Sequence, residues 1–110
     1  MTDYGHGLRF GVFITPNAAD AEHILELARL AEREGLDLVS FQDHPYQRRF
    51  LDAWTLLSMV AAQTESIRVA PNVANLPLRL PVMLARTAAS LDILSGGRVH
   101  LGLGAGAFWD

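Results

Sequence analysis

The chain has 110 residues, of which 50% are hydrophobic and 19% are charged, and its formal net charge is -3. This mix is typical of a globular protein and excludes a disordered chain, which needs low hydrophobicity with high net charge. The negative charge argues against a nucleic-acid partner, because nucleic-acid-binding domains normally carry a basic patch. The absence of cysteine excludes disulfides and thiolate metal sites.

The length predicts a single domain, 1–110, or part of one. Every apolar run is much shorter than the roughly 18 residues of a membrane span, so no membrane partner is expected. Residues 1–5 show no basic segment followed by an apolar stretch, so no signal peptide is expected either. Cytoplasmic localisation is the resulting prediction.

The first part of the chain predicts a strand, a helix and a second strand. Residues 8–14 are apolar and rich in branched and aromatic side chains, which predicts a buried strand. Residues 17–34 carry an apolar stripe at helical spacing, with Asn17 or Asp20 as the cap. Residues 36–41 predict the second strand.

The second part repeats this alternation. Asp52 is expected to cap a helix over residues 53–64, and a third strand begins at residues 67–70. A further helix is predicted over residues 81–94, followed by a fourth strand over residues 98–104. Trp54 and Met59 have helical spacing and are expected in the core.

Strands that alternate with helices predict an α/β fold with a parallel sheet and right-handed crossovers. Two architectures fit: a barrel of eight such units, which needs about 250 residues when complete, and a small open doubly wound sheet. Ligands bind at the carboxyl ends of the strands in both. The residues that follow each strand are therefore the candidates for a site.

Asp43 and His44 follow the second strand directly. Histidine could serve as acid, base or hydrogen-bond donor near neutral pH, and the aspartate could orient it or bind a ligand. The structural alternative is that Asp43 caps the next turn and His44 packs in the loop. The other histidines show no ligand spacing with His44, so no metal is assigned.

Two further strand ends are unusual. Residues 71–75, Pro-Asn-Val-Ala-Asn, predict either a bulge of the kind enriched at sites or an ordinary loop start. Gly102, Gly104 and Gly106 allow close backbone approach to a ligand or simply make space for packing. They match the dinucleotide fingerprint only weakly, because that motif needs a following helix and a later acidic residue.

Four arginines are candidates for contact with a phosphate or an acidic substrate. Arg48 and Arg49 share the loop of His44, and Arg79 lies in the loop before the third helix. Arg86 is mid-helix and is more simply a surface or packing residue.

Taken together, these segments resemble the bacterial luciferase-like family of flavin- and deazaflavin-dependent oxidoreductases. The resemblance runs through residues 10–16, 31–44 and 64–70. Its most specific part is residues 80–98, which end in Ser-Gly-Gly-Arg, followed by Leu-Gly-Leu-Gly-Ala-Gly over residues 101–106.

The resemblance implies a TIM (β/α)8 barrel, of which this chain would cover about the first four strands, a half-barrel. It implies that Asp43 and His44 face the ring of a cofactor, either coenzyme F420 or FMN. The Asp-His pair after the second strand resembles the deazaflavin-using members more than the flavin monooxygenases, which favours F420. The resemblance also implies a non-proline cis peptide near Asn72, Val73 and Ala74, behind the ring. Gly104, Ala105 and Gly106 would border the cofactor. The carboxylate that some deazaflavin members carry next is replaced by Ala107-Phe108-Trp109.

The activity implied is hydride transfer between a deazaflavin and a small organic substrate, with His44 and Asp43 as catalytic residues. One alternative is an FMN-dependent monooxygenase that uses molecular oxygen. Another is a non-catalytic half-barrel that binds neither cofactor, because the family holds the phosphate tail with later segments, and that assembles with itself or a partner half. Unpaired first and fourth strands would favour a homo-oligomer.

Overall fold

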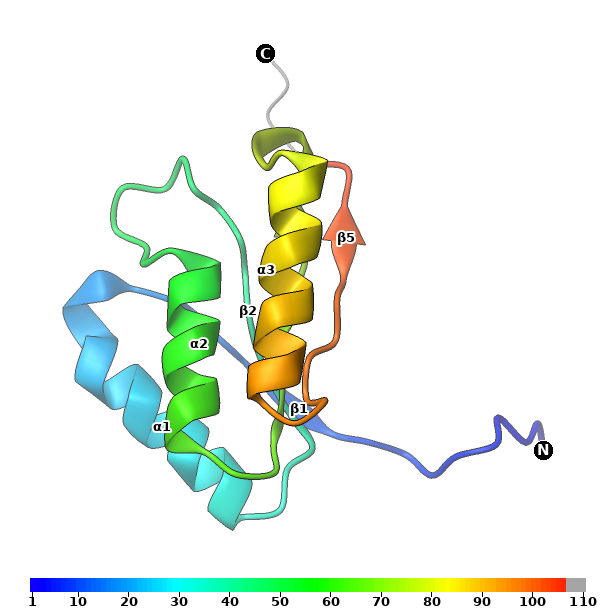
Figure 1. The fold of residues 1–110 in the computed structure, drawn as a ribbon. Coiled ribbons are helices and arrows are strands. Elements are labelled where there is room, and N and C mark those ends of the chain that lie inside the picture. The colour runs from blue at the N-terminus through cyan, green and yellow to red at the C-terminus, as the bar shows by residue number, and fades with distance from the viewer. Residues whose placement is uncertain (107–110) are drawn as a thin grey trace.

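The structure, a computed structural model, describes residues 1–106. Three parallel strands form the main sheet, with the second in the middle: β1 (Gly11–Ile14), β2 (Leu38–Phe41) and β3 (Arg68–Pro71). A separate parallel pair joins β4 (Ala74–Asn75) to β5 (Leu103–Gly104). The described chain is thus an α/β fold with parallel strands, as the alternation predicts (Figure 1).

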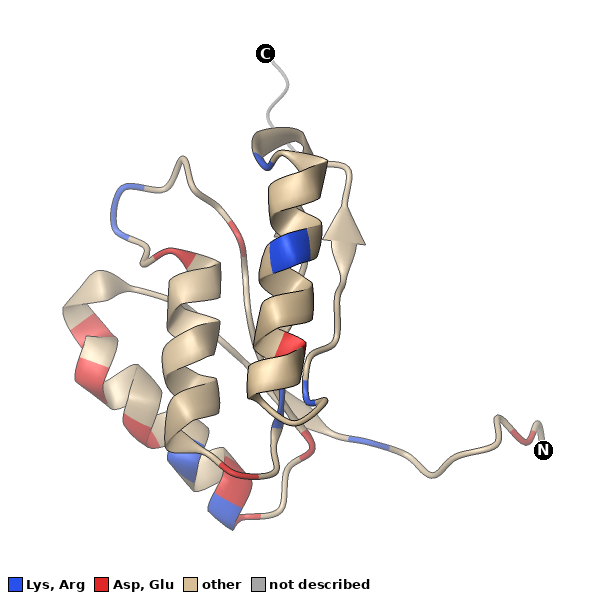
Figure 2. Ribbon diagram, viewed as in Figure 1, with Lys and Arg blue, Asp and Glu red and all other residues tan. Residues whose placement is uncertain are grey.

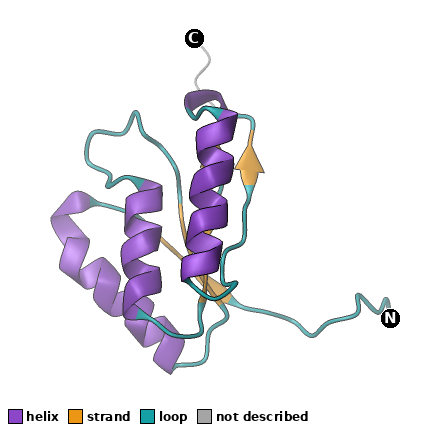
Figure 3. Cartoon of the chain, viewed as in Figure 1, coloured by secondary structure: helices purple, strands orange, loops and turns teal. Residues whose placement is uncertain are grey.

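Three helices connect the strands: α1 (Ala21–Arg33), α2 (Ala53–Gln63) and α3 (Pro81–Leu94). Short 3-10 turns precede two of them, η1 (Ala18–Asp20) and η2 (Leu76–Leu78). The helices lie together on one side of the strands (Figure 3). Right-handed crossovers place the helices on one side because the strands follow one another in the same direction, in the order β1-β2-β3.

Local capping sets where the helices begin. The Asp52 carboxylate accepts a hydrogen bond from the backbone N–H of Thr55 at 2.9 Å, which caps α2 as predicted. Pro81 is the first residue of α3, a position where its missing N–H costs nothing. The Asn17 side chain caps η1, and Asp20 makes no side-chain cap bond to α1.

The core lies between the helices and the main sheet. Its largest fully buried side chains come from β2, β3, α1 and α2. They are Phe41, Val39, Val69, Ile24, Leu57 and Val60. Trp54 belongs to this core, as predicted, whereas Met59 is exposed.

The predicted first strand is present over residues 11–14, but the prediction that it is buried and extends over residues 8–14 is wrong. Only residues 11–14 pair with β2, and Phe10 and Phe13 are 64% and 58% exposed. Burial of β1 on both faces needs a covering layer on each, and within residues 1–106 the helices cover only one.

The predicted fourth strand, residues 98–104, is interrupted. Val99 forms a single bridge to Val69, and Leu103 and Gly104 then pair with β4. Between these two contacts, the segment that pairs with residues 98–104 passes through Asn72 and Val73, which lie outside both β3 and β4. The ladder therefore breaks at the bulge, and the described residues form no closed barrel.

Charge is unevenly distributed over the helices. Figure 2 shows acidic and basic residues along α1 and in the loops, whereas α2 carries none. Within residues 1–106, no helix is long and apolar enough to cross a bilayer.

Candidate functional site

The carboxyl ends of the strands surround a cavity of about 270 Å³. Its lining comes from the β2 loop, the bulge after β3 and the segment that contains β5. The lining residues are Asp43, His44, Tyr46, Asn72, Val73, Asn75, Gly104, Ala105 and Gly106. The structure thus brings together every residue that the family resemblance places at the cofactor except Ala74, which is fully buried in β4.

Asp43 is 2% exposed, and both of its oxygens are occupied. Arg79 donates to Oδ2 from Nε and to Oδ1 from a terminal nitrogen, each at 2.7 Å. Oδ2 also accepts from the backbone N–H of Asn75 at 2.8 Å. The fork geometry is that of a bidentate charge-assisted pair. Asp43 therefore neither caps the next turn nor hydrogen-bonds His44, and instead ties the end of β2 to β4.

Arg79 also contacts the start of α2, since its terminal nitrogen lies 3.2 Å from Oδ1 of Asp52. The hydrogen bonds with Asp43 raise the pKa of Arg79, although partial burial opposes this shift. Burial raises the pKa of Asp52, but hydrogen bonds from Thr55 and Arg79 outweigh burial and leave it lowered. Asp52 and Arg79 therefore stay charged together at neutral pH.

His44 is half-buried, and its ring stacks on two aromatic neighbours. The ring centroids of His44 and Tyr46 are 5.2 Å apart, and those of His44 and Phe50 are 6.3 Å apart, with small interplanar angles. Within residues 1–106, neither ring nitrogen of His44 makes a hydrogen bond. The ring nitrogens of His44 are therefore available to hydrogen-bond a molecule in the cavity or to pass a proton to it.

The bulge after β3 forms one wall of the cavity. Its Asn72–Val73 peptide bond is cis, in the place that the family resemblance indicates. The backbone N–H of Asn72 donates to the carbonyl oxygen of Phe41 at 2.7 Å. Asn75 is 5% exposed, and its Oδ1 has no hydrogen-bond partner among the described residues. Asn75 thus contributes a buried, unpaired acceptor to the wall of the cavity, next to Gly106.

The segment that contains Gly104 and Gly106 forms another part of the cavity lining, and glycine is required at both positions. A Cβ atom at position 104 would overlap Cγ2 of Val73, and one at position 106 would lie 3.1 Å from Cγ of Pro77. Gly106 also has a φ of +83°, which few other residues adopt. These glycines let the β5 backbone pass against the bulge, where a side chain would occupy the space.

Sequence reasoning did not single out Tyr46, and it considered Asn75 only as part of the segment 71–75. Tyr46 lies two residues after His44, and this closeness in the sequence could have indicated that it lines the same site. Arg79 was expected to meet an anionic ligand, and the structure instead pairs it with Asp43. Arg48 and Arg49 are exposed and do not line the cavity.

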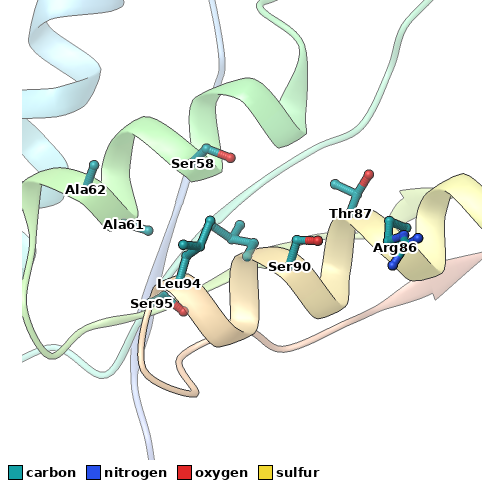
Figure 4. Close-up of a pocket in the computed structure, with 9 residues that line it drawn as sticks. Ser58, Ala61, Ala62, Arg86, Thr87, Ser90, Leu94 and Ser95 are labelled. Carbon is teal, nitrogen blue, oxygen red and sulfur yellow. The ribbon is translucent and has the colours of Figure 1, made fainter.

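A second cavity, of about 410 Å³, lies between α2 and α3 (Figure 4). Small residues such as Ser58, Ala61 and Ser90 line it, with Arg86 at its side. It contains no residue from a strand end and no titratable group besides Arg86. Among the described residues, no group of three or more His, Cys, Asp or Glu side chains is placed to hold a metal ion.

Comparison with known proteins identifies the class that this fold and strand-end site define. The family model described as luciferase-like monooxygenase matches residues 7–110. The chain therefore belongs to the luciferase-like monooxygenase family.

Two relatives extend this result. The 5,10-methylenetetrahydromethanopterin reductase of Methanolobus tindarius is 36% identical over 99 residues, which are 90% of this chain. The F420-dependent glucose-6-phosphate dehydrogenase of Rhodococcus erythropolis is 30% identical over 107 residues. The chain spans 29% and 31% of the length of these two relatives.

Solved structures agree with the family. The coenzyme F420 dependent tetrahydromethanopterin reductase from Methanopyrus kandleri has a TM-score of 0.83 and 28% identity, over 93% of this chain and 28% of its own. The FMN complex of the oxygenating constituent of 3,6-diketocamphane monooxygenase from Pseudomonas putida has a TM-score of 0.82 and 27% identity, over 94% and 31%. The relatives thus include F420-dependent reductases and an FMN-containing monooxygenase, which supports a luciferase-like oxidoreductase.

Proposed function

We propose that this chain contributes the ring-binding part of a deazaflavin-dependent oxidoreductase, in which a hydride passes between coenzyme F420 and a small organic substrate. The observation that carries the proposal is the cavity at the strand ends, which unites His44, Asn75 and the glycine wall. Two of the relatives named above support the deazaflavin, because their names include F420.

The cavity fits the ring of such a cofactor rather than the whole molecule. Its volume of about 270 Å³ is just below the roughly 300 to 1,000 Å³ of typical ligand pockets. The free Oδ1 of Asn75 offers an acceptor for a ring N–H, and Gly104 and Gly106 line the cavity without adding a side chain to it. The residues present therefore fit a flavin-type ring, and the phosphate tail would need other groups.

Each residue then has a distinct task. A bound deazaflavin supplies the two-electron hydride chemistry that protein side chains lack. His44 is the proposed catalytic residue, because its unpaired ring nitrogens can hold or deliver a proton in the cavity. Asn72, Val73 and Ala74 shape the wall behind the ring, while Gly104, Ala105 and Gly106 border it. Asp43 orients the cavity wall through its hydrogen bond with the backbone N–H of Asn75, and within the described residues it makes no hydrogen bond to His44.

The chain would form the N-terminal part of a barrel, as one domain over residues 1–110. Within the described residues β1 pairs only with β2, and β5 pairs only with β4, which leaves an outer edge on each. Such edges associate readily. We propose that they pair with a second copy or with later strands. Light scattering that found a well-folded monomer of this chain alone would contradict that assembly.

FMN is the second candidate cofactor, and the structure of the Pseudomonas putida monooxygenase in complex with FMN favours it. The reaction would then be an FMN-dependent monooxygenation with molecular oxygen. A third candidate is a non-catalytic module that only assembles, through the outer edges of β1 and β5.

Separate titrations of the complete gene product with F420 and with FMN, followed by fluorescence, distinguish these candidates. We expect saturable micromolar binding of F420 and weaker binding of FMN. Tighter binding of FMN would support the monooxygenase. Binding of neither would reject a cofactor-dependent activity and support the assembly module.

A further inference from the structure

We propose that Arg79 is a positioning residue of this site, which acts through Asp43 to fix where Asn75 presents its free oxygen. The inference rests on the proposed function for the ligand that this oxygen meets. It concerns a residue that lies outside the cavity lining.

The first step is the pair between Arg79 and Asp43. Two hydrogen bonds of 2.7 Å leave the carboxylate one orientation, and Asp43 is 2% exposed while Arg79 is 20% exposed. A buried carboxylate that loses its cation is left with an uncompensated charge, which is strongly unfavourable. Asp43 therefore depends on Arg79 to keep this position.

The second step links Asp43 to the cavity wall. Oδ2 of Asp43 accepts the backbone N–H of Asn75, at 2.8 Å, in addition to Nε of Arg79. The Asn75 residue that this bond holds is the one whose Oδ1 is buried without a partner. A shift of the carboxylate would move the Asn75 backbone and with it the free acceptor.

The third step is the anchor of Arg79 itself. Its terminal nitrogen also lies 3.2 Å from Oδ1 of Asp52, whose other oxygen caps α2 through Thr55. A guanidinium can bridge two carboxylates because its donors form a rigid planar fork, and a lysine ammonium cannot reproduce that geometry. The chain of contacts therefore runs from the start of α2 through Arg79 and Asp43 to Asn75.

Two readouts test the inference, and Arg86→Gln serves as the matched control because Arg86 is exposed on α3 beside the other cavity. The first is hydrogen exchange of the Asn75 amide without cofactor. We expect clearly faster exchange in Arg79→Gln and in Arg79→Lys, and the wild-type rate in Arg86→Gln. Unchanged protection of Asn75 in a folded Arg79→Lys protein would overturn the inference, whatever the cofactor results.

The second readout is the affinity of the complete gene product for the cofactor that the wild type binds. We expect Arg79→Lys and Arg79→Gln to raise Kd by at least about tenfold. If Arg79 acts through Asp43, its effect in an Asp43→Asn background must be much smaller. Equal effects in both backgrounds would contradict the mechanism. A wild type that binds neither cofactor would reject the proposed function, and the exchange result would still decide the role of Arg79.

Discussion

Arg98 donates a hydrogen bond from one terminal nitrogen to the carbonyl oxygen of Ala61, at 2.8 Å, in the last turn of α2. The same guanidinium reaches the carbonyl oxygens of Thr64 and Ile67, at 3.2 and 3.1 Å. The last carbonyls of a helix lack partners within the helix, and a cation satisfies them well. The arginine of the Ser-Gly-Gly-Arg turn thus fastens the segment after α3 to the end of α2 and the start of β3.

Replacement of Arg98 should therefore weaken the fold. Arg98→Lys should lower the free energy of unfolding by about 1 to 2 kcal/mol, because one ammonium cannot reach all these carbonyls. Arg98→Ala should lower it by about 3 kcal/mol. Urea unfolding measures both, with Arg48→Ala in the exposed loop as the control. Equal stability of Arg98→Lys and the wild type would show that the fork geometry is unimportant.

Glu32 should make stability depend on pH. Its carboxylate accepts hydrogen bonds from the backbone N–H groups of Glu65, Ser66 and Ile67. Burial raises its pKa, but these bonds outweigh burial and lower the pKa below 4.5. A lowered folded-state pKa contributes stability that is present above the unfolded value and lost as pH falls through the folded value.

The difference in unfolding free energy between the wild type and Glu32→Gln should consequently be largest near neutral pH and shrink below about pH 4.5. Urea unfolding across pH 3 to 7 measures it. Glu22→Gln, exposed on α1, should show no such trend. A difference that stays constant across the series would mean that the charge of Glu32 contributes nothing.

Gly11 should tolerate no side chain, because β1 and β2 are close at that point. A Cβ atom there would lie 2.6 Å from the carbonyl oxygen of Leu38, its partner in the register. Gly11→Ala should destabilise the protein by about 1 to 3 kcal/mol, as overpacking does. Gly7→Ala is the matched control, since a Cβ at position 7 meets nothing within 4 Å. Equal urea midpoints for the two variants would contradict the register of β1 and β2.

Replacement of His44 should weaken cofactor binding more than it lowers the stability of the fold. We expect His44→Ala to raise the Kd for F420 by about tenfold or more, because the ring lining the cavity is lost. His23→Ala, exposed on α1, should bind as the wild type does. Unchanged affinity in His44→Ala would remove His44 from the site and leave it a packing residue of its loop.

Sequence patterns predicted the helices well because their signals are local. The cap at Asp52 and the proline at position 81 fix the starts of α2 and α3, and α3 ends at Leu94 as expected. Burial of β1 could not be predicted, since it depends on which layers cover the sheet. The break in the fourth strand depends on the bulge at Asn72 and Val73, which lies between β3 and β4 and far from it in the sequence.

The site was predictable to a similar degree. Position after a strand places Asp43, His44 and the glycines at one edge of the sheet, so their convergence follows from the α/β pattern. The pairing of Asp43 with Arg79 could not be inferred, because the two residues are 36 positions apart and no periodicity connects them. The unpaired oxygen of Asn75 likewise emerges only when all neighbouring donors are placed.

The most direct test of the central claim is amide chemical-shift mapping of the isotope-labelled gene product during titration with F420. The account predicts that shifts concentrate at His44, Asn75, Gly104 and Gly106, which line the cavity at the strand ends. Amides beside the other cavity, such as those of Ser90 and Leu94, should stay unchanged. Shifts centred on α2 and α3, or no saturable shifts at the strand ends, would contradict the assignment of the cofactor site.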